Sequence, residues 1–429
     1  MKLLHVTNYF RDTHDHVGGA EQAVFRTALM SADHGHSIAI ATLKPDHPEK
    51  TALHPAFSFH GLPVLEDCAP GFARRYIEAA KWYSLQYDPL AKSAFARVLD
   101  AERPDAVHFH NFQFLTFSLL RAAHARGIPT AISIYDYWHF CPKAMLALPD
   151  NTCCKAAHGP GCITCLPKVM TGAQRALLSF RRRVFDRAFD LLDMFIVLSE
   201  HSRGVLEGYG IPAGKIEVVP LTLPVEYEAE PEGEAPAMVP ASLLFVGWLN
   251  DRKGVHAAIE AMPGILAEVP DARLYVIGGR AKFGSEYEER FNRFIAENGL
   301  TEKVEFLGHL PPATVKRYVK SARVLLLPEQ YENMSPLVMV EAMLLGTPVV
   351  ASGLGGIPEY IEDGQTGFLA DARDPATFAA GAVKLLKDPD LREAVVARAL
   401  KFIREKNDND RVWRITEDAY LKWKKQKCS

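Results

Sequence analysis

The sequence predicts an α/β fold of two tandem Rossmann-like domains that face each other across a cleft. Short apolar segments alternate with helix-length segments along most of the 429 residues, and one acidic, proline-rich segment interrupts the alternation. Such alternation is typical of parallel sheets with helices on both faces. Ligands of these sheets bind beyond the carboxyl ends of the strands, so two facing domains would form a binding cleft.

The first series of strands defines an N-terminal domain over residues 1–225. The expected strands are Lys2–Thr7, Ser37–Leu43, Ala106–His110, Pro129–Asp136, Phe195–Ser199 and Glu217–Leu221. The segment EYEAEPEGEAPAMVP (226–240) then lacks any hydrophobic period and is rich in glutamate and proline. It is predicted to be an interdomain linker.

A second series defines a C-terminal domain over residues 241–410. Its expected strands lie in SLLFVGWL, ARLYVIGG, KVEFLGHL, ARVLLLPE and TPVVASG. Three of them end at Gly247, Gly278 and Gly308, at intervals of 31 and 30 residues, the length of a strand–helix–strand unit. The helical segment RVWRITEDAYLKWKK (411–425) has no strand after it, so residues 411–429 are expected to pack back across the domain junction.

Composition excludes several classes of protein. The net charge of −3 does not suit a chain that coats nucleic acid. No apolar run has the length of a membrane span, and MKLLHVTNYF is predicted to be a strand instead of a signal peptide. We therefore expect a cytoplasmic protein, at most peripheral on the inner face of a membrane, whose seven cysteines are reduced or bind metal.

The segment SPLVMVEAMLLGTPVV (335–350) is predicted to be a buried helix with one carboxylate inside its apolar run. Ser335 suits the N-cap, Pro336 the first helical position and Gly346 the C-terminal end. A helix N-terminus can bind phosphate, and Glu341 would then lie within reach of a sugar hydroxyl pair. The alternative is that Glu341 pairs with a core arginine or with water.

Several linked motifs resemble the donor domain of retaining glycosyltransferases of family 4. They are FVGWLNDRKGV (245–255), VEFLGHL (304–310), YENMSPLVMVEAMLLGTPVVASGLGGIPEYI (331–361) and DGQTGFLA (363–370). The resemblance implies the two-Rossmann GT-B architecture over essentially the whole chain. It also implies transfer of a sugar from a nucleotide-diphosphate donor to an acceptor hydroxyl, in glycan, polysaccharide or glycolipid biosynthesis. No catalytic metal is expected, because thiolate-rich sites such as a cysteine cluster would form are usually closed.

The resemblance assigns roles to single residues. Glu341 matches the glutamate that binds the nucleotide ribose, and Glu332 is similar to the glutamate that binds the donor sugar. Lys253 matches the lysine that binds the diphosphate, together with the main-chain amides of Leu337 and Val338. The remaining expected donor-binding residues are Gly18, Gly19, Gly247, Trp248, Arg252, Gly308, His309, Leu310, Asn333 and Ser335.

The chain departs from the family pattern at two places in this domain. Eight residues separate Glu332 from Glu341 where the family usually has seven, so Asn333 occupies the usual position. Trp248 stands where the family usually has arginine, and Arg252 is the candidate to replace that charge.

In the N-terminal domain, HVGGAEQ (16–22) follows the first strand, and Gly18 and Gly19 form either a turn or a close approach to the donor. In VHFHN (107–111), alternation places His108 and His110 on one face, as core or as substrate-binding residues. In ISIYDYWHFCP (132–142), Asp136 keeps the family match, Tyr135 replaces the usual histidine, and His139 could substitute for it. The expected catalytic residues are Asp136, His139, Lys253 and Glu332.

Five of the seven cysteines fall between residues 141 and 165. Cys162 and Cys165 are spaced as in a zinc knuckle, and Cys141 with Cys153 or Cys154 could complete a tetrahedral structural site. The alternatives are reduced thiols in a loop, or a disulfide. The spacing does not match the common iron–sulfur patterns, so a cluster is less expected.

Residues 175–192 are predicted to form an amphipathic helix with five arginines. It is either a solvated face or a surface for an anionic lipid-linked acceptor. The expected partners are a nucleotide sugar and a glycan, lipid-linked or small-molecule acceptor, with no nucleic acid. Two other functions remain open: a sugar-nucleotide epimerase of the same architecture, and a non-catalytic nucleotide-sugar binding or scaffold protein.

Overall fold

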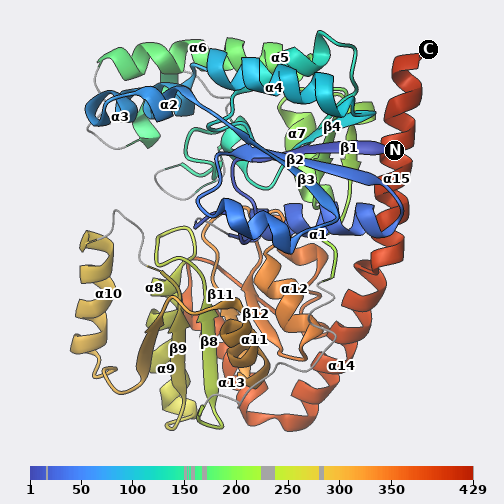
Figure 1. The fold of residues 1–429 in the computed structure, drawn as a ribbon. Helices are drawn as coiled ribbons and strands as arrows, with labels where there is room; N and C mark the ends of the chain where they lie inside the picture. The colour runs from blue at the N-terminus through green and yellow to red at the C-terminus, as the bar shows by residue number, and fades with distance from the viewer. Residues whose placement is uncertain are drawn as a thin grey trace. The chain divides into compact units, whose positions relative to one another are not determined.

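The computed structural model describes residues 1–15, 18–148, 152, 154–155, 160–166, 172–223, 237–279 and 285–428 (Figure 1). The chain divides into two compact units. Unit 1 comprises Met1–Thr222 and the chain from Asn409 onward, and unit 2 comprises Leu223–Asp408. The predicted domain limits at 225 and 410 lie close to these divisions, while most of the predicted linker lies outside the described residues.

Unit 1 contains a seven-stranded sheet in the order β3-β2-β1-β4-β5-β6-β7, and every pair of neighbours is parallel. The strands are β1 Lys2–Val6, β2 Ser37–Leu43, β3 Phe57–Leu62, β4 Ala106–Phe109, β5 Thr130–Ser133, β6 Met194–Val197 and β7 Ile216–Val218. The six predicted strands are present, most of them shorter than expected. The sequence analysis missed β3, an edge strand whose middle residues are partly exposed and include a glycine.

The helices of unit 1 cover both faces of this sheet, with α1 on one side and α4 and α5 on the other (Figure 1). The α-helices are α1 Gly19–Asp33, α2 Leu65–Cys68, α3 Gly71–Tyr83, α4 Pro89–Glu102, α5 Phe117–His124, α6 Gly172–Phe189, α7 Glu200–Gly208 and α15 Asn409–Cys428. Short 3₁₀ helices are η1 Pro48–Leu53, η2 Tyr137–His139, η3 Pro160–Cys165 and η4 Ala213–Lys215. Local sequence explains several helix starts: Asp88, for example, accepts the Ala91 N–H and precedes a proline at the first position of α4.

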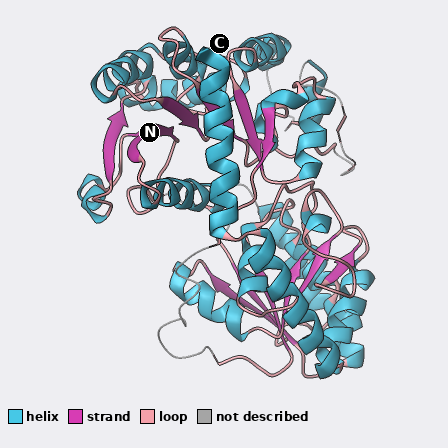
Figure 2. Cartoon of the chain, turned by 90° about the vertical axis from the view of Figure 1, so that its right-hand side faces the viewer, coloured by secondary structure: helices cyan, strands magenta, loops and turns pink. Residues whose placement is uncertain are grey.

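The last helix, α15, belongs to unit 1 although the chain reaches it from unit 2 (Figure 2). The Trp413 ring stacks on His34 with 4.4 Å between the ring centroids. The Tyr420 hydroxyl lies 2.7 Å from Nδ1 of His108. Trp413 and Tyr420 are buried, so the helix contributes to the apolar interior of this unit.

Unit 2 contains a six-stranded parallel sheet in the order β10-β9-β8-β11-β12-β13. The strands are β8 Ser242–Val246, β9 Arg273–Ile277, β10 Val304–Gly308, β11 Val324–Leu327, β12 Val349–Ser352 and β13 Phe368–Ala370. Five of them were predicted, and the short β13 was missed. Two parallel sheets covered by helices confirm the predicted α/β fold.

Successive residues of the unit 2 strands pack into different cores, as side-chain alternation requires. Leu243 and Phe245 of β8 lie in one buried cluster, and Leu244 lies in another. The helices are α8 Val255–Glu260, α9 Met262–Glu268, α10 Ser285–Glu297, α11 Pro312–Ser321, α12 Leu337–Leu344, α13 Pro375–Lys387 and α14 Pro389–Lys406, with the 3₁₀ helix η6 Ile357–Glu359. Residues of α8, α9, α10 and α13 contribute to the first cluster, and residues of α11, α12 and α14 to the second.

Among the described residues, no helix is both long enough and apolar enough to span a membrane.

Candidate active site

The helix α12 begins one residue later than predicted and ends where predicted. Pro336 is the N-cap because its ψ of 118° is extended, and this corrects the assignment of that position to Ser335. At the other end, Gly346 has a φ of +79°. The Thr347 N–H donates to the Ala342 carbonyl at 2.9 Å, and the Gly346 N–H donates to the Met343 carbonyl at 3.4 Å, which together form a Schellman end.

Glu341 lies on a half-buried stripe of α12, whereas the sequence predicted a helix buried on all sides. Met339, Val340, Ala342 and Met343 are buried. The stripe consists of Leu337, Val338, Glu341, Leu344 and Leu345, and it runs along the helix from its first turn. The carboxylate therefore lies on the one side of α12 that a ligand could reach without disturbing the core.

An ion pair with one buried and one partly exposed partner lies between the ends of β8 and β11. The Lys253 ammonium donates to Oε1 of Glu329 at 2.6 Å, and the Asn333 amide donates to the same oxygen at 3.2 Å. Glu329 is fully buried, while the Lys253 side chain is 25% exposed. Within the described part of the chain, Oε2 of Glu329 has no hydrogen-bond partner.

The charge of Lys253 is secured by this pair. Burial by itself would lower the pKa of the ammonium, but the charge and hydrogen bond of Glu329, together with the neighbouring Tyr331, hold the pKa above its usual value. Lys253 is thus a permanent cation that remains partly accessible. That is the property required of a residue that binds a diphosphate.

A second cation, Arg252, lies beside Lys253 over the ring of Tyr331. The Arg252 guanidinium carbon is 4.9 Å from the ring centroid, and the Lys253 nitrogen is 5.8 Å from it. The Gln330 N–H donates to the Arg252 carbonyl at 2.9 Å. This bond holds the loop after β8 against the segment after β11.

Glycines allow three strand-end loops to pack backbone against backbone. A Cβ on Gly254, whose φ is +69°, would lie 1.9 Å from the Pro328 carbonyl oxygen. A Cβ on Gly355, whose φ is +62°, would lie 2.3 Å from the Asn333 carbonyl oxygen, which also accepts the Gly356 N–H at 2.8 Å. The loops follow the parallel strands β8, β11 and β12, so they gather at the carboxyl edge of the sheet, where ligands bind in this class of fold.

The neighbouring strand ends hold the other predicted donor residues of unit 2. A Cβ on Gly278 would lie 1.8 Å from the Gly247 carbonyl oxygen, so β8 and β9 meet closely here. The Trp248 ring lies against Gly279 and is 43% exposed. Gly308 ends β10 with a φ of +72°, after which His309 is exposed and Leu310 is half-buried.

Glu329 is an important residue to which the sequence analysis gave no role, although the segment PEQYEN (328–333) places it with Glu332 at the end of a strand. Glu332 lies half-buried in the same loop. A usable signal was present: Glu329 follows Pro328 directly after the wholly apolar strand VLLL, where a carboxylate is expected to be buried and to need a cation. Asn333 stands where the usual glutamate spacing would place a carboxylate, and its amide donates a hydrogen bond to Glu329.

In unit 1, Gly18 and Gly19 form the start of α1. The Gly18 N–H donates to Oε2 of Glu21 at 2.8 Å. Glu21 is buried and lies in the first turn, where a carboxylate is stabilised by the helix dipole. His16 and Val17, which precede the glycines, lie outside the described residues.

Asp136 and His139 lie at the end of β5 in different surroundings. The Asp136 carboxylate accepts the Trp138 N–H at 2.8 Å and caps η2. The His139 ring is 3% exposed and lies among Phe112, Trp138 and Phe189. Burial lowers the pKa of His139 to about 3, and neither ring nitrogen has a hydrogen-bond partner among the described residues. This ring is therefore a core residue of unit 1.

The predicted zinc site remains a prediction. Cys153 lies outside the described residues, Cys141 is buried, and Cys154, Cys162 and Cys165 are partly exposed. Among the described residues, the cysteines do not form a group of three with sulfurs close enough to share one ion.

Helix α6 carries the five arginines predicted for an amphipathic surface, but one of them is a core residue. Arg181 is fully buried, and its guanidinium donates to the carbonyls of Trp82 at 2.7 Å, Tyr83 at 2.9 Å and Trp138. Burial lowers its pKa to about 9. Arg182, Arg183 and Arg187 are exposed, so the solvated face of α6 retains a positive charge.

Two parallel sheets, each covered by helices, make up the GT-B class of fold. The model of Glycosyltransferase Family 4 matches residues 17–226, and the model of Glycosyl transferases group 1 matches residues 227–402. The chain is 31% identical to D-inositol 3-phosphate glycosyltransferase of Corynebacterium urealyticum over 329 residues. The aligned segment covers 73% of each of the two chains. The protein belongs to this family of glycosyltransferases.

Other relatives match over shorter segments. D-inositol 3-phosphate glycosyltransferase of Acidothermus cellulolyticus is 35% identical over 37% of each chain. Phosphatidyl-myo-inositol mannosyltransferase of Mycobacterium leprae is 34% identical over 38% of this chain and 42% of its own. The chain thus matches about two fifths of the length of these two curated relatives.

Solved structures share the fold along nearly the whole chain. Sucrose-phosphate synthase from Thermosynechococcus elongatus superimposes with a TM-score of 0.73 at 18% identity, over 98% of both chains. HepE of Anabaena, solved in complex with UDP-glucose, superimposes with a TM-score of 0.66 at 17% identity, over 98% of this chain and 100% of its own.

Proposed function

We propose that this protein is a retaining glycosyltransferase that moves a sugar from a nucleoside-diphosphate donor to an acceptor hydroxyl. The observation that carries the proposal is the partly accessible Lys253 ammonium held by buried Glu329 at the carboxyl edge of the second sheet. Arg252 lies beside it, and the helix α12 begins on the same loop. Two cations and a helix N-terminus suit a diphosphate.

Each part of the donor has a candidate partner in unit 2. Lys253, Arg252 and the first amides of α12, those of Leu337 and Val338, would bind the diphosphate, because a helix leaves its first N–H groups without intrahelical partners. Glu341 on the half-buried stripe would accept hydrogen bonds from the ribose hydroxyls. Glu332 would bind the sugar, and the exposed loop with His309 would lie near the base.

The proposed chemistry needs stabilisation of a leaving nucleoside diphosphate. In the retaining mechanism of this family, an oxygen of the donor phosphate takes the acceptor proton, so the protein acts mainly by positioning and electrostatics. Preorganised cations aimed at the developing charge can supply most of such a rate enhancement. Lys253 suits this role because Glu329 fixes both its position and its charge.

A thermal-shift screen against a panel of nucleotide sugars tests the proposal and identifies the donor. Binding to the folded state raises the melting temperature by mass action, so the preferred donor should give the largest shift. Sugar transfer to a panel of acceptors is then measured with that donor. Binding without transfer would favour a non-catalytic nucleotide-sugar protein, conversion of the donor without acceptor would favour an epimerase, and no binding would contradict the proposal.

The substitution Glu341→Gln should weaken donor binding with little change in apo stability. The amide keeps the size of the side chain but is a poorer acceptor for two hydroxyls, so we expect a loss of about 10-fold or more in affinity, as hydrogen bonds to charged groups contribute about 1.5–3 kcal/mol. Calorimetric titration with donor and thermal melting of the apo protein are the measurements. Lower apo stability with unchanged affinity would instead assign Glu341 a structural role.

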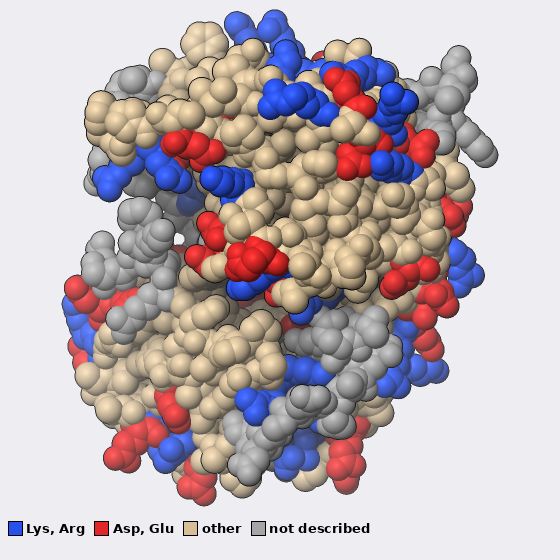
Figure 3. Space-filling view, in the orientation of Figure 1, with Lys and Arg blue, Asp and Glu red and all other residues tan. Residues whose placement is uncertain are grey.

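We further propose that the acceptor is carried by a lipid at the cytoplasmic face of a membrane. Helices α3 and α6 of unit 1 pack on each other and expose large apolar side chains beside arginines. Phe72 is 76% exposed, Tyr76 is 77% exposed and Phe180 is 58% exposed. Arg182, Arg183 and Arg187 of α6 are exposed, and Lys and Arg side chains are visible at the upper edge of Figure 3. An apolar surface with basic neighbours suits an anionic lipid interface.

Replacing Phe72 and Tyr76 together by serine should reduce binding to vesicles of anionic phospholipid, because two large side chains would no longer enter the interface. We expect a loss of roughly 10-fold or more, given 1.5 kcal/mol or more for burying each large apolar side chain. Co-sedimentation with vesicles measures the effect. Leu53→Ser is the matched control, since Leu53 is 64% exposed on η1 of the same unit. Equal vesicle binding by all three proteins would contradict the lipid surface.

A further inference from the structure

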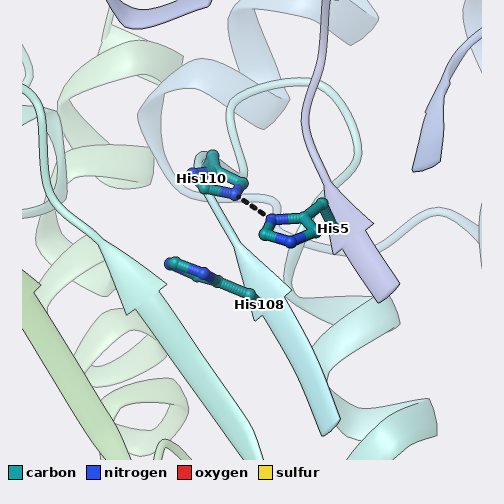
Figure 4. A group of neighbouring side chains, drawn as sticks. All are labelled: His5, His108 and His110. Atoms are coloured by element: carbon teal, nitrogen blue, oxygen red, sulfur yellow. Dashed lines mark hydrogen bonds between the residues drawn. The ribbon is translucent and has the colours of Figure 1, made fainter. Parts of the chain in front are cut away.

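Three histidines of unit 1 gather at the carboxyl end of two neighbouring strands. His5 of β1 is paired in register with His108 of β4, and His110 follows directly after β4 (Figure 4). All three are buried, and their side chains lie on the same face of the sheet. The rings of His108 and His110 stack with 4.2 Å between centroids.

Nearly every ring nitrogen of this cluster has a polar neighbour. Nδ1 of His5 lies 2.9 Å from Nε2 of His110, and Nδ1 of His110 lies 3.0 Å from the Tyr135 hydroxyl. Nδ1 of His108 lies 2.7 Å from the Tyr420 hydroxyl, and its Nε2 lies 2.8 Å from the Ser133 hydroxyl. The exception is Nε2 of His5, which is buried without a hydrogen-bond partner among the described residues.

We propose that His5, His108 and His110 form a binding site for a first-row transition-metal ion, with zinc the expected occupant. Each of the three residues offers one ring nitrogen, and these three nitrogens all lie within 4.8 Å of one another. Neutral imidazole is the form that binds such ions, and three histidines with a fourth open position make a recognised zinc ligand set.

The geometry requires only small side-chain movements. Nitrogens that share an ion at 2.0–2.1 Å in a tetrahedral site are about 3.3 Å apart. The 2.9 Å pair of His5 and His110 would open slightly, and the widest separation would shorten by up to about 1.5 Å through ring rotation.

The surrounding hydroxyls complete the argument. Histidines that bind metal usually donate their other ring N–H to an oxygen, which fixes the tautomer. The Tyr135 hydroxyl is in position to accept from His110, and the Tyr420 or Ser133 hydroxyl is in position to accept from His108. Because Tyr420 belongs to α15, a metal ion here would also strengthen the attachment of that helix to the sheet.

The test uses the full-length chain without a histidine tag, stripped with a chelator and then titrated with Zn²⁺ or Co²⁺. We expect uptake of about one ion per chain into a nitrogen-only site, a higher melting temperature, and Co²⁺ absorption without thiolate-to-metal bands. His110→Gln should lower the affinity by more than about 100-fold, and Tyr135→Phe, which leaves the three rings in place, by about 10–100-fold. His256→Asn in unit 2 is the control and should bind normally.

Two results would overturn the proposal. One is a wild-type protein that takes up neither ion and melts at the same temperature with and without them, which would leave only a neutral hydrogen-bond network. The other is binding that survives in His110→Gln and is lost in Cys162→Ser, which would assign the ion to the cysteines. If His110→Gln fails to fold, the titration of the wild-type protein and the affinity of Tyr135→Phe still decide whether the three histidines bind the ion.

Discussion

Replacing Lys253 by methionine should lower the turnover by at least about 100-fold and also destabilise unit 2 by roughly 3 kcal/mol. The first effect follows from removing a preorganised cation from the leaving diphosphate. The second follows from leaving the fully buried Glu329 carboxylate without its charged partner, which typically costs about 3–5 kcal/mol. Initial rates at saturating donor and calorimetric melting measure the two effects separately.

A double variant separates the structural role of the ion pair from its chemical role. Adding Glu329→Gln to Lys253→Met removes the uncompensated charge, and the new amide can still meet Asn333. Stability should largely return, whereas turnover should stay low because the cation is still absent. If Lys253→Met retains normal turnover, the stabilisation of the leaving group belongs to Arg252 or to the backbone amides of α12.

Gly254→Ala should destabilise unit 2 severely and abolish donor binding. A Cβ at this position would lie 1.9 Å from the Pro328 carbonyl oxygen, which belongs to backbone and cannot turn aside as a flexible side chain could. The clash would separate the loop after β8 from the loop after β11, and with it Lys253 from Glu329. The left-handed φ of +69° adds about 1–2 kcal/mol. Thermal melting and donor titration measure the outcome.

Gly299→Ala is the control for the backbone conformation. Gly299 has a φ of +65°, close to that of Gly254, but a Cβ there would meet nothing within 4 Å. This variant should lose only the conformational term of about 1–2 kcal/mol and should bind donor normally. Equal losses in the two variants would show that the close approach at Pro328 contributes nothing.

Most of the fold could be predicted because parallel α/β sheets leave a strong signal in the sequence. Buried parallel strands are continuous apolar runs, as in the segment VLLL of β11. The strands that escaped detection, β3 and β13, lie at sheet edges. The sequence of β3 lacks a continuous apolar pattern because its middle residues are partly exposed, whereas β13 has only the three apolar residues FLA, too short a run to indicate a strand.

Features near the site could be predicted where the local sequence of one residue determines its role. They could not be predicted where two residues far apart in the sequence have to meet. Gly346 could be assigned as the end of α12 because a left-handed residue after an apolar helix favours glycine. The contact between Lys253 and Glu329 could not, since 75 residues lie between them and only the adjacency of β8 and β11 brings them together. The burial of His139 was also missed, because it depends on rings from α6 and from the loop after β4.

The position of α15 affects how the protein can acquire its structure during synthesis. Unit 2 has all of its residues once the ribosome has passed Asp408, whereas unit 1 still lacks α15 at that moment. The half of the chain that is translated first is therefore finished last. Before α15 is made, the ring of His34 lacks the stacking contact with Trp413. His108 likewise lacks its hydrogen bond with the Tyr420 hydroxyl. A chain that ends at Asp408 and has been released from the ribosome should consequently contain a folded unit 2 and an unfinished unit 1.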